Sequence, residues 1–252
     1  MSRLTLESCL DQLRSYSDER LVVGCIYCGG TEETREHVPS RIFLDMPFPE
    51  NLPVVGACWK CNNGFSSDEE YLACLIESVL AGSTDPDHIH RQRIGALLRR
   101  SAGLRARLEA MKSLVNGRLQ FGVEQKRVSV IVTKLARGHT VFELGQSPRG
   151  DPTAIWWHPI ELMNEDDRAS FEAVEAEPIL GEIGSRSSQR LLVAQISLRS
   201  STGEDSKIHL LMNDWIEVQA GRYRYYAFEN GEQIAVKMVI REYLACEVAW
   251  NT

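Results

Sequence analysis

Two Cys-x-x-Cys pairs, with 29 residues between them, are the strongest constraint on how this 252-residue chain folds. The first pair is Cys25 and Cys28, and the second is Cys58 and Cys61. A gap of two residues lets one tight turn direct both sulfurs at the same ion, and two such pairs are the usual signature of a closed four-cysteine zinc site. The chain opens on an amphipathic, acidic segment and not on a secretory leader, so we expect a reducing, cytoplasmic setting that favours metal over disulfides. The sequence therefore predicts a structural Zn²⁺ held by these four cysteines.

Polar side chains with catalytic potential lie between the two Cys pairs and directly after the second one. In chain order they are Glu36, His37, Asn51, Asn62 and Asn63. Three prolines between residues 47 and 53 forbid a regular helix in that stretch. Farther on, Ser67 and Glu70 have the spacing of a helix capping box, and Gly82 can end that helix. The predicted order is thus Cys pair, β-hairpin, Cys pair, helix.

This arrangement resembles the HNH nuclease family, a ββα-metal fold in which two Cys pairs hold the structural zinc when one is present. The resemblance covers about residues 22–82, a third of the chain. The family pattern is matched here by Glu36, His37, Pro39, Asn51 and Asn62. Many members have Asp at the position of Glu36 and His at the position of Asn62, so this chain departs from the common pattern at two of its positions.

The resemblance implies that His37 is the general base of a phosphodiester hydrolase. An imidazole near its unperturbed pKa at neutral pH can take a proton from an attacking water. Asn51 would fix the orientation of the imidazole through a hydrogen bond. Arg41, just past the motif, would contact the phosphate.

The resemblance also implies a catalytic divalent cation, Mg²⁺ or Mn²⁺, beside the zinc. Glu36 and Asn62 would hold it through oxygen atoms, which suit a hard cation. Asn63 is the alternative ligand to Asn62, and the phase of the helix decides between them. The bound cation would polarise the scissile phosphate and stabilise the leaving oxygen.

Charge is distributed unevenly along the chain, although the net charge is −7. Residues 1–87 hold 6 Lys/Arg against 15 Asp/Glu, residues 88–137 hold 12 against 2, and residues 138–252 hold 10 against 18. The basic central segment predicts a surface that follows nucleic-acid phosphates, with a solvated helix face as the alternative. The arginines predicted to bind nucleic acid are Arg41, Arg91, Arg93, Arg99 and Arg100.

Periodicity predicts an α+β protein in three segments. Residues 1–87 form the zinc-stabilised ββα-metal module, with a short helix over residues 5–16. Residues 88–118 form a basic helical connector, which Gly95 or Gly103 can kink. Residues 119–252 form a mainly β accessory domain, in which 128–132 and 141–144 are among the expected strands and Asn230-Gly231 is the turn of a hairpin.

The sequence as a whole favours a metal-dependent HNH endonuclease that cleaves phosphodiester bonds, with DNA favoured over RNA, in a defence, toxin or mobile-element setting. The alternative is a non-catalytic zinc-stabilised module that binds nucleic acid or protein. The accessory domain offers a surface for a homodimer or a regulatory partner. No apolar run reaches transmembrane length, so no membrane partner is expected.

Overall fold

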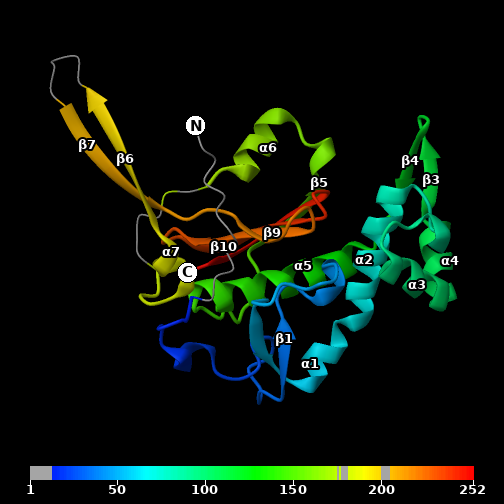
Figure 1. The fold of residues 1–252 in the computed structure, drawn as a ribbon, viewed down its shortest axis with the longest axis horizontal. Helices are drawn as coiled ribbons and strands as arrows, with labels where there is room; N and C mark the ends of the chain where they lie inside the picture. The colour runs from blue at the N-terminus through cyan, green and yellow to red at the C-terminus, as the bar shows by residue number, and fades with distance from the viewer. Residues whose placement is uncertain (1–12, 175, 177–180, 200–204) are drawn as a thin grey trace.

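Helices and β-sheets occur together in the computed structural model, which describes residues 13–174, 176, 181–199 and 205–252 (Figure 1). Helices dominate the first half, and the second half is rich in strands. The predicted α+β class is therefore confirmed. Within the described residues, no helix is both long and apolar enough to cross a membrane.

The N-terminal module follows the predicted order of Cys pair, hairpin, Cys pair and helix. Its elements are η1 (Glu19–Val22), β1 (Thr34–His37), η2 (Arg41–Phe43), β2 (Val54–Ala57), α1 (Trp59–Gly64) and α2 (Ser66–Ala81). Strands β1 and β2 are antiparallel, with Glu36 opposite Val55 and His37 opposite Val54. The expected helix over residues 5–16 lies mostly outside the described residues, and residues 13–16 are not helical.

The predicted capping box of Ser67 and Glu70 was wrong, and the helix begins two residues earlier than that box implies. Helix α2 begins at Ser66 behind Phe65, which makes no side-chain cap, so Ser67 is already inside the helix. Its end was predicted correctly. Gly82 takes a left-handed φ of 62°, and its N–H donates to the last turn, which is the common glycine stop of a helix.

The basic connector is two short helices and a hairpin. After η3 (Pro86–His88), α3 (Gln92–Arg100) and α4 (Ala102–Ala110) are separated at Ser101, so neither Gly95 nor Gly103 marks the break. Strands β3 (Lys112–Val115) and β4 (Arg118–Phe121) follow and pair with each other. Asn116 and Gly117 between them both have positive φ, as a two-residue hairpin turn requires.

A five-stranded antiparallel sheet forms the C-terminal half, in the order β5-β11-β10-β9-β8. The strands are β5 (Ala154–Pro159), β8 (Ile216–Gln219), β9 (Tyr223–Glu229), β10 (Gln233–Ile240) and β11 (Leu244–Asn251). The predicted hairpin about Asn230-Gly231 is confirmed, since it joins β9 to β10. Helix α6 (Glu165–Glu172), which follows η5 (Ile160–Leu162), packs Phe171 on the outer face of the sheet.

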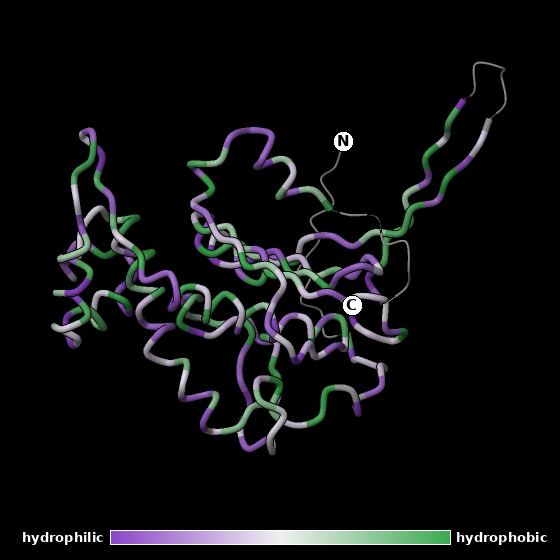
Figure 2. Tube along the Cα trace, turned by 180° about the vertical axis from the view of Figure 1, so that it is seen from behind, coloured by the Kyte–Doolittle hydropathy of each residue, from purple (hydrophilic) through white to green (hydrophobic). Residues whose placement is uncertain are grey.

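A second β-pair lies apart from this sheet. After α7 (Arg186–Arg190), β6 (Leu192–Arg199) and β7 (Asp205–Met212) form a two-stranded sheet and extend away from the rest of the molecule (Figure 1). At the base of this arm, Met212 also forms a β-bridge with Ala176. Hydrophobic and hydrophilic residues alternate along this arm, as Figure 2 shows.

Two segments predicted as strands are helical. Residues 128–132 lie in α5 (Gln125–His139), and residues 141–144 lie in the π-helical turn η4 (Thr140–Leu144). The β-branched run around Val128 suits a strand, but Val128, Ile131, Val132 and Leu135 also follow helical spacing, and all four are buried. Burial between two layers outweighs the local β-propensity here.

Helix α5 crosses the centre of the molecule, between the N-terminal module and the five-stranded sheet (Figure 1). One hydrophobic cluster includes Phe43, Ile94, Ile131 and Val236, so all three predicted segments contribute to it. The candidate site is thus built on elements that share one core.

We expect Gly138→Ala to lower the free energy of unfolding by about 1–3 kcal/mol, because overpacking a tight contact forces side chains out of place. A Cβ on Gly138 would lie 2.6 Å from Val38 Cγ2, at the point where α5 meets the module. Urea unfolding measures the change, and Val38→Ala in the same chain should restore part of it. Gly103→Ala, which meets nothing within 4 Å, is the matched control and should stabilise α4.

Candidate functional site

The structure brings the four predicted cysteines together. The Sγ atoms of Cys25, Cys28, Cys58 and Cys61 all lie within 4.8 Å of one another, and all four thiols are free. The sulfurs of Cys28 and Cys58 are 3.7 Å apart, far beyond disulfide bonding distance. A tetrahedral zinc site with Zn–S bonds of about 2.3 Å has sulfur–sulfur edges of about 3.8 Å. The four sulfurs can therefore hold a metal ion such as zinc.

Local backbone geometry directs each pair of sulfurs. In the first pair, Gly29 has a φ of 74° and donates its N–H to the carbonyl of Cys25 at 2.7 Å, which closes a tight turn. In the second pair, Cys58 is the N-cap of α1, and its sulfur accepts the N–H of Cys61 at 3.4 Å. A turn and a helix start thus present the two halves of the site.

The thiols of the cluster differ in how readily they lose a proton. Burial raises the pKa of Cys25, but the backbone N–H groups of Cys58, Cys28 and Tyr27 outweigh it and bring the value to about 7. Burial and the neighbouring thiols raise the pKa of Cys61. A bound cation would favour the thiolate form of all four cysteines.

Glu36 faces the interior, where it meets a lysine from α5. The Nζ atom of Lys134 lies 2.9 Å from Glu36 Oε1 and donates to Ser40 Oγ at 2.6 Å. It also forms an ion pair with Glu69 of α2. Burial raises the pKa of Glu36, and the Lys134 ammonium lowers it in part. Two carboxylates and a hydroxyl thus converge on one buried positive charge.

A buried hydroxyl without a partner borders this cluster. Within the described residues, Oη of Tyr27 is buried and makes no hydrogen bond. Burial and then the charges of Glu36 and Glu69 raise the pKa of this phenol well above its ordinary value. The ring of Tyr27 packs edge-on against Phe65 at 5.0 Å. The cluster therefore offers one more oxygen donor than its present contacts use.

Sequence reasoning missed Ser40, Glu69 and Lys134. Ser40 and Glu69 carry no motif of their own, although each lies close to a predicted residue. Lys134 is 98 residues from Glu36, on a helix that was predicted as a strand. Only the correct helical phase of α5 would have placed this lysine on the side that faces the module.

His37 points to the face of β1 opposite Glu36, because neighbouring strand residues alternate between faces. Its Nδ1 is buried and has no hydrogen-bond partner among the described residues. Burial, and then the positive charge of Arg41, lower the pKa of this imidazole. His37 is therefore neutral at neutral pH, with a free nitrogen.

Basic and aromatic side chains gather beside His37. Arg41 lies over the ring of Phe48 at 5.3 Å, and Arg93 lies over the same ring at 6.0 Å. Arg93 also donates to the carbonyl oxygen of Arg41 at 3.2 Å, which joins the start of α3 to the module. We call Arg41, Phe48 and Arg93 the Phe48 patch; both arginines are exposed.

The three predicted asparagines occupy different places. Asn62 faces β1 and donates its amide to Thr34 Oγ1 at 2.9 Å. Asn63 is exposed, so Asn62 is the one that faces the strand carrying Glu36. Asn51 lies in the β1–β2 connection, three residues before Val54, the register partner of His37.

The prediction that Arg91 belongs to an exposed basic face is wrong. Its guanidinium is buried, and it lies 2.6 Å from Asp45 Oδ1, 2.6 Å from the carbonyl oxygen of Leu44 and 3.6 Å from Glu77. Because the Arg91 guanidinium is buried against these partners, which include the buried acid Glu77, it has no access to a phosphate. Arg91 instead ties α3 to the module and to α2.

Arg99 and Arg100 are exposed, as predicted, at the end of α3. Arg99 is paired with Asp87 at 2.6 Å, and Arg100 lies 3.8 Å from Glu70. Exposed ion pairs of this kind contribute little and exchange readily with solvent. Both arginines therefore remain accessible to a polyanion.

Comparison of the chain with family models, with curated proteins and with solved structures found no match.

We expect the purified protein to carry one zinc ion per chain, and Cys58→Ala to lose it. Elemental analysis measures the metal content. Cys74→Ala, a change of a buried cysteine outside the cluster, is the control and should keep the zinc. Removal of the metal should lower the free energy of unfolding by about 4 kcal/mol relative to protein in free zinc a thousandfold above Kd. Equal zinc content in wild type and Cys58→Ala would contradict the site.

Proposed function

We propose that this chain is a metal-dependent HNH-type endonuclease that hydrolyses phosphodiester bonds. The single observation that supports it best is the His37 imidazole, whose neutral form burial and Arg41 favour, near the exposed Arg41 of the Phe48 patch. A base and two phosphate-binding groups side by side are what hydrolysis of a phosphodiester requires. The zinc-ligating Cys pairs bracket this arrangement in sequence.

The zinc ion has a structural role in this proposal. Four cysteine ligands close the coordination sphere and leave no position for a substrate or water. The ion joins the turn at Cys25 to the start of α1, and thereby holds β1 and its Glu36-His37 pair in place. In this proposal the zinc ion does not contact the phosphate, and the hydrolysis takes place at His37.

His37 acts as the general base in this scheme. Its neutral imidazole takes a proton from water as the water oxygen attacks phosphorus, and the bond to the leaving oxygen breaks. Arg41 and Arg93 neutralise the charge that develops on the phosphate oxygens. Phe48 offers a flat surface for a base of the nucleic acid.

The residues around Glu36 fit a second, divalent cation by donor chemistry. Glu36, Glu69, Ser40 and the unpartnered Tyr27 hydroxyl are all oxygen donors, which Mg²⁺ and Mn²⁺ prefer. Asn62 lies on the same side of β1, where its amide contacts Thr34. A divalent cation can supply Lewis-acid chemistry to a phosphate, but one held here would lie on the face of β1 opposite His37, so no part of the step at His37 is assigned to it.

A specific observation favours the alternative, a non-catalytic zinc module that binds nucleic acid. Lys134 already supplies a positive charge to Glu36 and Glu69, so the pair is stable without a divalent cation. In this alternative, the exposed Arg93, Arg99 and Arg100 bind the polyanion, and His37 has no catalytic role. The two functions are separated by measuring cleavage and binding apart: the endonuclease cleaves the nucleic acid that it binds, and the non-catalytic module binds without cleaving.

DNA is the substrate that we propose, with RNA as the competing polymer, in a defence, toxin or mobile-element role. The exposed arginines of α3 extend the Phe48 patch along the helix. A regulatory partner or a second copy would contact the C-terminal half. Cytoplasmic placement is part of the same proposal.

We expect wild-type protein with MgCl₂ or MnCl₂ to cleave plasmid or single-stranded DNA, and His37→Ala to cleave roughly 10²–10⁴-fold more slowly. Gel electrophoresis measures the products, and elemental analysis confirms that the variant keeps its zinc. His90→Ala, on an exposed histidine, is the matched control and should cleave like wild type. Cleavage that survives in His37→Ala would overturn the role of the base.

The rate of cleavage in the same assay should depend on pH. Because burial and Arg41 lower the pKa of His37, its neutral form persists below the ordinary value of 6.5. Cleavage should therefore stay constant from neutral pH down through 6.5, and fall only at lower pH, as the imidazole gains a proton. An Arg41→Gln chain should show this fall at higher pH, because the lowering charge is gone.

We expect Lys134→Met to lower the free energy of unfolding by about 3–5 kcal/mol, because it leaves two buried carboxylates without a counter-charge. Excess MgCl₂ should restore much of the loss in this variant if the Glu36 cluster accepts a divalent cation. Chemical denaturation with and without MgCl₂ measures both effects. Lys126→Met, on the exposed side of α5, should change stability by less than about 0.5 kcal/mol. No response of the variant to MgCl₂ would contradict the cation site.

A further inference from the structure

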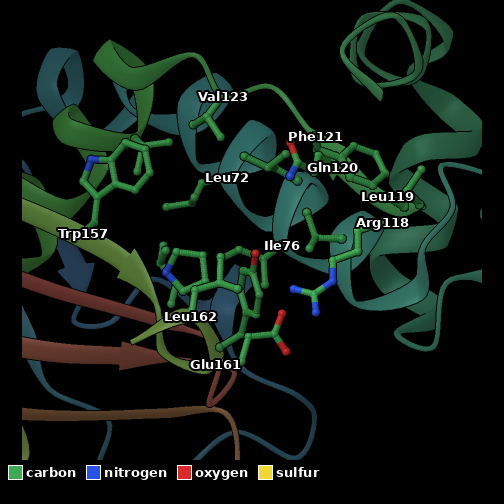
Figure 3. A pocket seen from close by; sticks show the side chains of 16 residues that line it. Leu72, Ile76, Arg118, Leu119, Gln120, Phe121, Val123, Trp157, Glu161 and Leu162 are labelled. Atoms are coloured by element: carbon green, nitrogen blue, oxygen red, sulfur yellow. The ribbon is translucent and has the colours of Figure 1, made fainter. Parts of the chain in front are cut away.

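A cavity of about 800 Å³ lies between α2, the β3–β4 hairpin and the β5 edge of the five-stranded sheet (Figure 3). Its walls are mainly aliphatic and aromatic. The principal apolar side chains are Leu72, Ile76, Phe121, Val123, Trp157 and Leu162. Ligand pockets of this size, lined by apolar groups with a few polar ones, are the usual form of small-molecule sites.

Two charged side chains of the cavity face each other. Arg118 of β4 and Glu161 of η5 extend toward each other from opposite walls, as Figure 3 shows. Within the described part of the chain, neither side chain makes a hydrogen bond or an ion pair. The hydroxyl of Tyr243 is likewise unbonded, and burial and then the charge of Glu161 raise its pKa. Gln120 also lines the cavity, but it lies nearer Phe121 in Figure 3.

The apolar walls and the two opposite charges together indicate the class of ligand. An apolar body would cover side chains that otherwise face water, such as Leu119 and Leu162, which are 39% and 60% exposed. A fully anionic head would be attracted by Arg118 but repelled by Glu161, and a cationic head would meet the reverse. A neutral head with both a donor and an acceptor satisfies Glu161 and Arg118 at once.

We propose that this cavity binds an amphipathic small molecule with an apolar body and an uncharged polar head, such as an amide or a hydroxyl group. The head lies between Arg118 and Glu161, and the body lies along α2 toward Trp157. The site is separate from the zinc cluster and does not depend on nuclease activity. It does share α2 with the candidate catalytic cluster, since Glu69 is one turn before Leu72.

Three matched probes test this ligand class by isothermal titration calorimetry, each used below its micelle concentration. They are N-(2-hydroxyethyl)decanamide, decanoate and decylammonium. We expect saturable binding of one amide molecule per chain, tighter than binding of either charged probe. Glu161→Gln should strengthen decanoate binding, and Arg118→Gln should strengthen decylammonium binding, each by roughly three- to fivefold.

A filling variant shows whether the probes enter this cavity. Leu119→Trp places a large side chain at its wall and should abolish amide binding. Leu114→Trp, on the partner strand and 72% exposed but outside the cavity lining, is the matched control and should bind like wild type. Thermal unfolding checks that both variants fold. If Leu119→Trp does not fold, the two charge variants alone decide.

The proposal would be overturned if none of the three probes binds saturably. It would also be overturned if binding is unchanged in Leu119→Trp, or if Glu161→Gln leaves the affinity for decanoate, and Arg118→Gln the affinity for decylammonium, as in wild type. A protein segment that docks on the cavity would show the first of these outcomes. None of them bears on cleavage by His37, so failure here and failure of the nuclease proposal are distinguishable.

Discussion

Burial of charge on helix α5 is the constraint around which the N-terminal module is arranged. Lys134 is almost fully buried, so its ammonium must be paired, and Glu36 and Glu69 supply the charge from two different elements. This contact fixes how β1, α2 and α5 meet. The close approach of Gly138 to Val38 brings the same helix against the module one turn later.

The alternation of β1 separates two chemical environments. Glu36 faces a crowded, buried cluster of charge, whereas His37 lies on the other face and feels the charge of the exposed Arg41. Two adjacent residues therefore have different electrostatic surroundings. The four-cysteine cluster, at the ends of the same hairpin, takes part in neither environment.

The local sequence pattern predicted the structure correctly where short-range geometry decides it. It failed where burial in the core decides the structure. The Cys turns, the Gly82 helix stop and the Asn230-Gly231 hairpin each depend on residues within a few positions of one another. Residues 128–132 satisfy both strand propensity and helical spacing, and only packing between two layers selects the helix. Arg91 likewise has the sequence spacing of an exposed basic helix face. Its ion-pair partners Asp45 and Glu77, however, come from other parts of the chain.

The sequence by itself determined the four-cysteine cluster, the order of elements around it and the α+β class, because each depends on short spacings or on composition. The tertiary structure alone decided that Lys134 meets Glu36, that Arg91 is buried, and that Arg118 and Glu161 face one cavity. These contacts join residues tens of positions apart, and their free energy arises from desolvation and charge pairing, which no local pattern records.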